Sequence, residues 1–194
     1  NKTDHASLPS GLITQMAATD RCLYVVGGRD SSFNLRRTIY KAQFDAAIIS
    51  NWKATSTRLP SGLVWHAVAV DNNTLYVVGG EKSEGVSEKV FAFDITPACE
   101  LNRNRSKERS LSDRSLGVQR QAVATRFGEL YIVGGETDRG NFTNKAWQIK
   151  LEAPNPTLNL AKHAELSGDV DYGTVITYTL RYHNPWPNPA GQSG

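Results

Sequence analysis

The chain has 194 residues, 39% of them hydrophobic, and a formal net charge of +3. That charge is too small to indicate a nucleic-acid partner, and no run of about 18 apolar residues is present that would predict a membrane span. Composition therefore favours a globular module without a membrane span or a nucleic-acid partner.

One short apolar run occurs three times, at residues 23–28, 75–80 and 130–135, and each copy ends in two glycines. The paired glycines are Gly27 and Gly28, Gly79 and Gly80, and Gly134 and Gly135. An apolar run of this length bounded by turn residues predicts a buried strand. Glycine ends such a strand because it adopts positive φ and lets backbones approach closely. The first glycines lie 52 and then 55 residues apart, which indicates an internal repeat of about 50 residues.

The repeat extends to both sides of these runs. Upstream, the sequence of residues 8–12 recurs at residues 59–63. Residues 65–70 predict a further strand, joined to the middle run by residues 71–74, whose Asp and Asn side chains favour a tight hairpin. Downstream, each run leads to a second aromatic strand, with Tyr40, Phe91 and Trp147 in equivalent places. Helical periodicity is absent, so we expect an all-β fold.

The repeat resembles the kelch family over roughly residues 5–150, and Trp52 matches the family's fourth-strand tryptophan. The resemblance implies a partial kelch-type β-propeller with about three blades represented, followed by a short β and proline-rich segment. Propellers close with roughly four to eight blades. We therefore expect a longer natural protein, or other subunits, to supply the remaining blades.

The second repeat departs from the pattern, because residues 102–110 are rich in Arg and no tryptophan matches Trp52. A basic run can bind nucleic acid or acidic polymers. Since no aromatic residues interleave the arginines, a stacking platform for single strands is absent. A solvated loop between outer strands is the favoured interpretation.

Beyond residue 150 the sequence changes character. Residues 151–165 contain Pro154 and Pro156 and predict a linker or an irregular outer edge. Residues 172–184 alternate apolar and polar side chains, which predicts a half-buried strand. This segment resembles the opening of the repeated Ig-like domain of bacterial surface proteins, so residues 166–194 are expected to begin such a β-sandwich or to form a C-terminal tail.

The chain contains two cysteines, Cys22 and Cys99. Two cysteines can form one bridge in an oxidising compartment, or they can remain separate thiols. Sequence separation alone leaves both possibilities open.

No catalytic, metal or cofactor site is predicted. The histidines are scattered and lack the short spacing of a zinc site. His66, beside Trp65 near a strand start, is the best single catalytic candidate, but catalysis needs convergent partners that the sequence does not show. A structural role for His66 is favoured.

Binding is the function that the sequence favours. The kelch resemblance implies that one propeller face is built from the loops after the glycine pairs and the loops that enter the next blade. Its arginines can engage carboxylates by bidentate pairing, or they can pair with neighbouring acidic residues. The candidate ligand contacts are Arg29, Asp30, Arg36, Arg37, Trp65, His66, Glu81, Arg114, Arg120, Asp138 and Arg139.

The sequence therefore predicts a non-enzymatic kelch module that binds a protein or a glycan within a larger, exported bacterial surface protein. One alternative is a sugar-active kelch enzyme of the copper oxidase or epimerase type. A second alternative is a cytoplasmic kelch adaptor.

Overall fold

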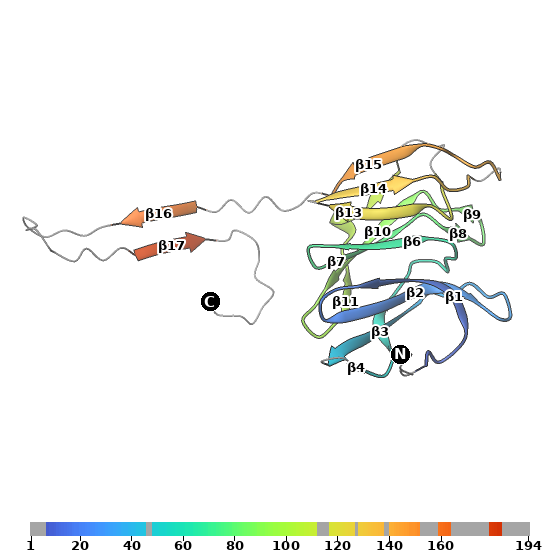
Figure 1. The fold of residues 1–194 in the computed structure, drawn as a ribbon, viewed down its shortest axis with the longest axis horizontal. Coiled ribbons are helices and arrows are strands. Elements are labelled where there is room, and N and C mark those ends of the chain that lie inside the picture. Colours follow the sequence, from blue (N-terminus) through green and yellow to red (C-terminus); the bar gives the residue numbers. More distant parts are fainter. Residues whose placement is uncertain are drawn as a thin grey trace, which may run out of the picture. The chain divides into compact units, whose positions relative to one another are not determined.

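The computed structural model describes residues 7–45, 48–111, 117–126, 128–137, 140–151, 159–163 and 179–183. The chain divides into two compact units, Asn1–Leu151 and Glu152–Gly194. The larger unit is built from antiparallel sheets (Figure 1). Its regular structure confirms the predicted all-β class.

Sheet 1 contains five strands. β1 (Leu12–Ala18), β2 (Cys22–Asp30), β3 (Thr38–Asp45) and β5 (Lys53–Arg58) pair in that order, and the short β4 (Ile48–Ile49) also pairs with β3. Trp52 lies immediately before β5, the outer strand of the sheet.

Sheet 2 repeats this order. β6 (Ala67–Asp71), β7 (Thr74–Val78), β10 (Lys89–Ile95) and β11 (Leu101–Arg103) pair in sequence, with β12 (Arg109–Ser110) also on β10. A small hairpin of β8 (Glu81–Lys82) and β9 (Gly85–Val86) connects β7 to β10. Sheet 3 has β13 (Ala122–Arg126), β14 (Glu129–Val133) and β15 (Ala146–Lys150). The first strands of the sheets, β1, β6 and β13, lie side by side (Figure 1).

The hairpin between β6 and β7 has the predicted two-residue turn. Asn72 and Asn73 have φ values of 43° and 58°. Positive φ at both central residues is the requirement of a type I′ turn, which asparagine tolerates. The preceding strand begins at Ala67 rather than at the predicted Trp65. Trp65 has a φ of 54°, which is incompatible with extended backbone, so the strand starts two residues later.

The strand register places the aromatic residues of the repeat in the same position of each sheet. Tyr40 pairs with Val25, Phe91 with Val77 and Trp147 with Ile132. The sheets pack face to face around two hydrophobic clusters. The first cluster lies between sheets 1 and 2 and contains Tyr24, Val26 and Ile39 of sheet 1 with Leu75, Val77, Phe91 and Phe93 of sheet 2. The second lies between sheets 2 and 3 and contains Tyr76, Val78 and Val90 of sheet 2 with Leu130 and Ile132 of sheet 3. Because alternate residues of a strand point to opposite faces, each apolar run fills both sides of its sheet.

A disulfide joins sheet 1 to sheet 2. Cys22, the first residue of β2, is bonded to Cys99 in the loop between β10 and β11, with the Cα atoms 5.8 Å apart. The Tyr24 hydroxyl donates a hydrogen bond to the Cys99 carbonyl at 3.2 Å. The structure therefore resolves the alternative that the sequence left open in favour of a bridge.

The basic segment at residues 102–110 is more ordered than the predicted loop. It contributes β11 and β12 to sheet 2, with a 3₁₀ turn at Arg105–Lys107 between them. Arg103 donates two hydrogen bonds to the Glu108 carboxylate, and Lys107 lies 2.7 Å from Asp94. These pairs neutralise part of the run. The Lys107–Asp94 pair and the pairing of β11 and β12 with β10 tie the run to sheet 2, so the expectation of a single solvated loop is wrong.

The smaller unit contains one antiparallel strand pair, β16 (Asn159–His163) and β17 (Thr179–His183), among the residues described there. β17 falls within the predicted strand at residues 172–184. β16 falls within residues 151–165, where a linker was expected, and its backbone groups pair with β17 across five residue positions. The rest of the Ig-like resemblance lies outside the described residues. No helix in the described part of the chain is long and apolar enough to cross a membrane.

Candidate binding face

The segments that enter sheets 2 and 3 share an unusual backbone. Trp65 and Arg120 have φ values of 54° and 59°, although neither is a glycine. Just before them, Val64 exchanges backbone hydrogen bonds with Glu81, and Gln119 exchanges them with Glu136. Trp65 and Arg120 therefore occupy the same place in successive sheets.

The second glycine of each pair permits this arrangement. A Cβ atom at Gly80 would lie 2.6 Å from the Cβ of His66, and one at Gly135 would lie 2.8 Å from the carbonyl oxygen of Gln119. Both glycines also have positive φ. Because these positions are glycines, the backbone of the entering segment can pass closer to the backbone at the end of the apolar run than any side chain there would allow.

The same crossing brings two arginines onto one indole ring. The guanidinium carbon of Arg29 lies 5.3 Å from the centroid of the Trp65 ring, and that of Arg120 lies 3.8 Å away. Arg29 also lies 4.9 Å from the ring of Phe33, which is 73% exposed. A guanidinium within about 6 Å of an aromatic centroid is held by cation–π attraction. The structure therefore unites three predicted site residues, one from each sheet.

The two arginines differ in their remaining contacts. Arg120 forms an ion pair with Glu136. Arg29 forms no ion pair with any residue that the structure describes. Within the described part of the chain, the guanidinium group of Arg29 therefore has no acidic partner, whereas that of Arg120 has one.

The other predicted residues near Arg29 serve the loop itself. Asp30 pairs with Arg36 and accepts the backbone N–H of Asn34 at 2.9 Å. The Asn34 amide, followed by its side chain and Arg36, lowers the pKa of Asp30. Arg37 donates from Nε to the Leu59 carbonyl at 2.8 Å. These contacts fix the loop between β2 and β3.

Glu81 and His66 lie in the same crossing region but have other surroundings. Glu81 contributes its backbone groups to the bridge with Val64. His66 is 2% exposed, and neither ring nitrogen has a hydrogen-bond partner among the described residues. Burial lowers the pKa of His66 to about 4, although the nearby Val26 backbone opposes the shift. At neutral pH this imidazole is uncharged and lies beneath the surface.

Three predicted contacts, Arg114, Asp138 and Arg139, lie outside the described residues. Two participants were missed by sequence reasoning, Phe33 and Glu136. Phe33 was detectable as an aromatic residue between Arg29 and Arg36 in the same loop. Glu136 was detectable as the repeat equivalent of Arg29 and Glu81, directly after a glycine pair.

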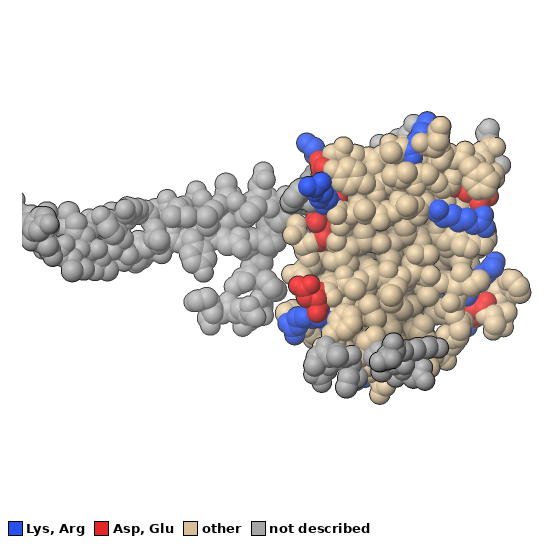
Figure 2. Space-filling view, viewed as in Figure 1, with Lys and Arg blue, Asp and Glu red and all other residues tan. Residues whose placement is uncertain are grey.

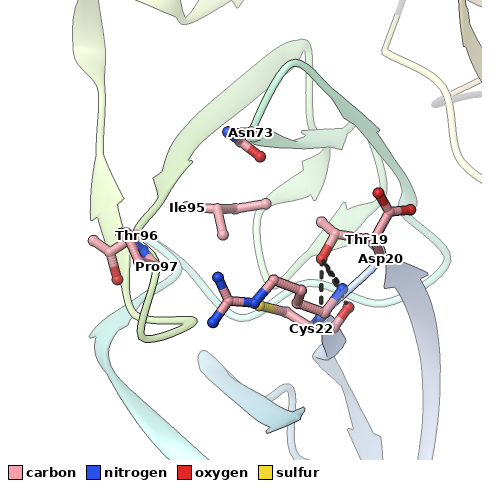
Figure 3. A pocket seen from close by; sticks show the side chains of 8 residues that line it. Thr19, Asp20, Cys22, Asn73, Ile95, Thr96 and Pro97 are labelled. Carbon is pink, nitrogen blue, oxygen red and sulfur yellow. Dashed lines mark hydrogen bonds between the residues drawn. The ribbon is translucent and has the colours of Figure 1, made fainter. Parts of the chain in front are cut away.

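A hollow of about 250 Å³ lies where the turns between strands meet (Figure 3). It is lined by residues 19–21 of the β1–β2 turn and Cys22 at the start of β2, by Asn73, and by Ile95 at the end of β10 with Thr96 and Pro97 after it. Thr19 Oγ1 accepts the backbone N–H groups of Arg21 and Cys22, which shapes one wall. No group of three or more His, Cys, Asp and Glu side chains in the described chain is placed to hold a metal ion. The hollow adds no catalytic set to the arginine cluster.

Comparison with known proteins gives a likeness of fold. No family model matches the chain. The solved structure of YjhT superposes on 76% of this chain with a TM-score of 0.60 and 15% sequence identity. The match covers 45% of the YjhT chain, so this chain spans less than half of that protein's length.

Proposed function

We propose that this chain is a non-enzymatic binding module of the kelch-propeller type. In this proposal the three sheets are successive blades. The face bearing Arg29, Trp65 and Arg120 binds the carboxylate groups of a protein or glycan ligand. The repeated strand order of sheets 1 and 2 and the two hydrophobic clusters between successive sheets support the architecture. Rigid β scaffolds commonly present recognition residues on such end loops.

The placement of two arginines over one tryptophan is the observation that carries the proposal. Stacking on Trp65 restricts both guanidinium groups, so less conformational entropy is lost when they bind a ligand. Guanidinium groups donate to carboxylates in bidentate geometry. Because Arg29 lacks an acidic partner among the described residues, an incoming carboxylate would supply the missing acceptor and reduce the repulsion between the two cations.

Export to the cell surface is part of the proposal. The bond between Cys22 and Cys99 supports it, because disulfides form and persist in oxidising compartments and are rare in the cytosol. Residues 166–194, within the smaller unit, would then begin an Ig-like spacer.

A set of immobilised polymers tests the proposed function. Polygalacturonate and poly-glutamate present carboxylates on a glycan and on a peptide backbone, and the methyl ester of polygalacturonate keeps the sugar but removes the charge. We expect binding to at least one of the acidic polymers and weaker binding to the ester. Equal binding to the ester, or no binding to either acid, would contradict carboxylate recognition. Stoichiometric copper or measurable sugar turnover would instead support the enzymatic alternative.

A further inference from the structure

Glu136 makes a contact that its counterpart in sheet 2 does not make. It directly follows the third glycine pair, as Arg29 and Glu81 follow the first and the second. Glu136 forms an ion pair with Arg120, whereas Glu81 forms none with any residue that the structure describes. An acidic side chain of the protein itself therefore lies within the arginine cluster.

Both partners of this ion pair extend from fixed backbone. Glu136 exchanges two backbone hydrogen bonds with Gln119, of 2.9 and 3.0 Å, and a second bridge joins it to Phe142. Arg120 donates its backbone N–H to the Trp65 carbonyl and stacks on the Trp65 ring. The crossing of the chain at the entrance of sheet 3 therefore brings the Glu136 carboxylate to the Arg120 guanidinium group.

The same crossing forms in sheet 2 without an ion pair. Trp65 takes the place of Arg120 there, and both residues have a left-handed backbone. Val64 exchanges backbone hydrogen bonds with Glu81, as the preceding residue of sheet 3 does with Glu136. The crossing therefore does not require a charged side chain after the glycine pair. Removal of the charge at Glu136 should leave the fold intact.

The ion pair is open enough for a ligand to replace it. The Arg120 side chain is 45% exposed and that of Glu136 is 16% exposed. Partly exposed ion pairs add little stability, because water and salt screen them. Figure 2 shows basic and acidic side chains beside one another at the ends of the strands. A carboxylate that arrives at a strand end thus meets cations that already have acidic neighbours, and it has to compete for them.

We propose that Glu136 is an internal competitor for the ligand of the binding face, an inference that rests on the proposed function. In the free protein the Glu136 carboxylate occupies Arg120. An acidic ligand binds first to Arg29, which has no acidic partner among the described residues, and a second carboxylate of the ligand then replaces Glu136 at Arg120. Both guanidinium groups stack on one ring, 5.3 and 3.8 Å from its centroid, so neighbouring carboxylates of one polymer can reach both. Binding exchanges one ion pair for another, which lowers the affinity.

Calorimetric titration of the acidic polymer that binds, polygalacturonate or poly-glutamate, tests this competition. Glu136→Gln keeps the size of the side chain and removes its charge. We expect the affinity to rise by up to about fivefold, the upper end for a partly exposed ion pair. Glu84→Gln is the matched control, because Glu84 pairs with Lys82 in the β8–β9 hairpin and loses the same charge. It should change the affinity much less, and circular dichroism of both variants should match that of the unaltered chain.

A double-mutant cycle with Arg120→Ala separates displacement from a general effect of charge. Without Arg120 the Glu136 carboxylate has no guanidinium group to occupy, so Glu136→Gln should no longer raise the affinity. Equal gains with and without Arg120 would indicate a long-range charge effect and would overturn the proposal. Weaker binding by Glu136→Gln would also overturn it, because Glu136 would then position Arg120 for the ligand.

The same titrations distinguish this inference from the proposed function. Binding by the unaltered chain with no gain in Glu136→Gln would overturn the competition alone and leave the proposed function standing. Absence of binding by every variant would overturn both.

Discussion

Arg120 contacts Trp65 twice, through its backbone N–H, which donates a 2.7 Å hydrogen bond to the Trp65 carbonyl, and through its guanidinium group, 3.8 Å from the ring centroid. The two residues hold the same left-handed conformation at the entrances of successive sheets. Their contact fixes the spacing of these entrances. Arg29, from sheet 1, then meets the same ring. The cluster is therefore positioned by the stacking of three sheets rather than by one flexible loop.

The glycine pairs should respond unequally to alanine. Gly80→Ala combines a φ of +89° with a Cβ placed 2.6 Å from that of His66, whereas Gly134→Ala has a φ of +65° but no contact closer than 3.6 Å. Left-handed backbone alone costs roughly 1–2 kcal/mol, and forced overlap adds about 1–3 kcal/mol. We expect urea unfolding to show a clearly larger loss of stability for Gly80→Ala. Equal losses would mean that the close crossing does not constrain the sheet entrance.

His66 should make the stability of the fold depend on pH. Histidine in an unfolded chain has a pKa near 6.5, and burial lowers the pKa of His66 in the folded chain to about 4. Between these values the unfolded chain binds more protons, so the free energy of unfolding falls as the pH is lowered, by up to about 1.4 kcal/mol per pH unit.

The variant His66→Gln isolates this effect. Gln121 occupies the equivalent place at the entrance of sheet 3 and donates from Nε2 to the Val78 carbonyl at 2.7 Å. A glutamine at position 66 has the same opportunity at Val26. Urea unfolding between pH 4 and 7 should give a smaller slope of stability against pH for the variant than for the unaltered chain. Identical slopes would show that His66 does not titrate with a lowered pKa.

Reduction of the disulfide should destabilise the larger unit. Cys22 and Cys99 are separated by 77 residues, and a bridge that closes a long loop contributes about 2–5 kcal/mol. We expect dithiothreitol to lower the urea midpoint of the unaltered chain. The double variant Cys22→Ser, Cys99→Ser should already have the lowered midpoint and should not respond to the reductant. An unchanged midpoint on full reduction, with thiol release verified, would argue against this contribution.

Much of the larger unit could be predicted from local chemistry. The apolar runs, the paired glycines and the Asn72–Asn73 turn each have one dominant physical solution, and the structure adopts it. The equivalent register of Tyr40, Phe91 and Trp147 agrees with their similar spacing after the runs, which is 12, 11 and 12 residues beyond the second glycine. Local patterns could not place β16, because its pairing with β17 is set by residues distant in sequence.

The arginine cluster was only partly predictable. Arg29, Trp65 and Arg120 were each identifiable as loop residues, but their convergence depends on the positive φ of Trp65 and Arg120, which non-glycine residues rarely adopt. The equivalence of Trp65 and Arg120 was hidden, because the two positions carry different residue types. The disulfide was undetermined for a related reason, since only the stacking of sheets 1 and 2 brings Cys22 to Cys99.

The most direct test of the binding face is calorimetric titration of the acidic polymer that binds, polygalacturonate or poly-glutamate, into the unaltered chain, Arg29→Ala/Arg120→Ala and Arg58→Ala. Arg58 lies exposed on the outer strand β5, so its removal controls for a general loss of positive charge. A charged hydrogen bond contributes about 1.5–3 kcal/mol, which predicts at least a tenfold loss of affinity for the double variant. Arg58→Ala should bind nearly as tightly as the unaltered chain. Equal affinity for the double variant and the unaltered chain would contradict recognition through Arg29 and Arg120.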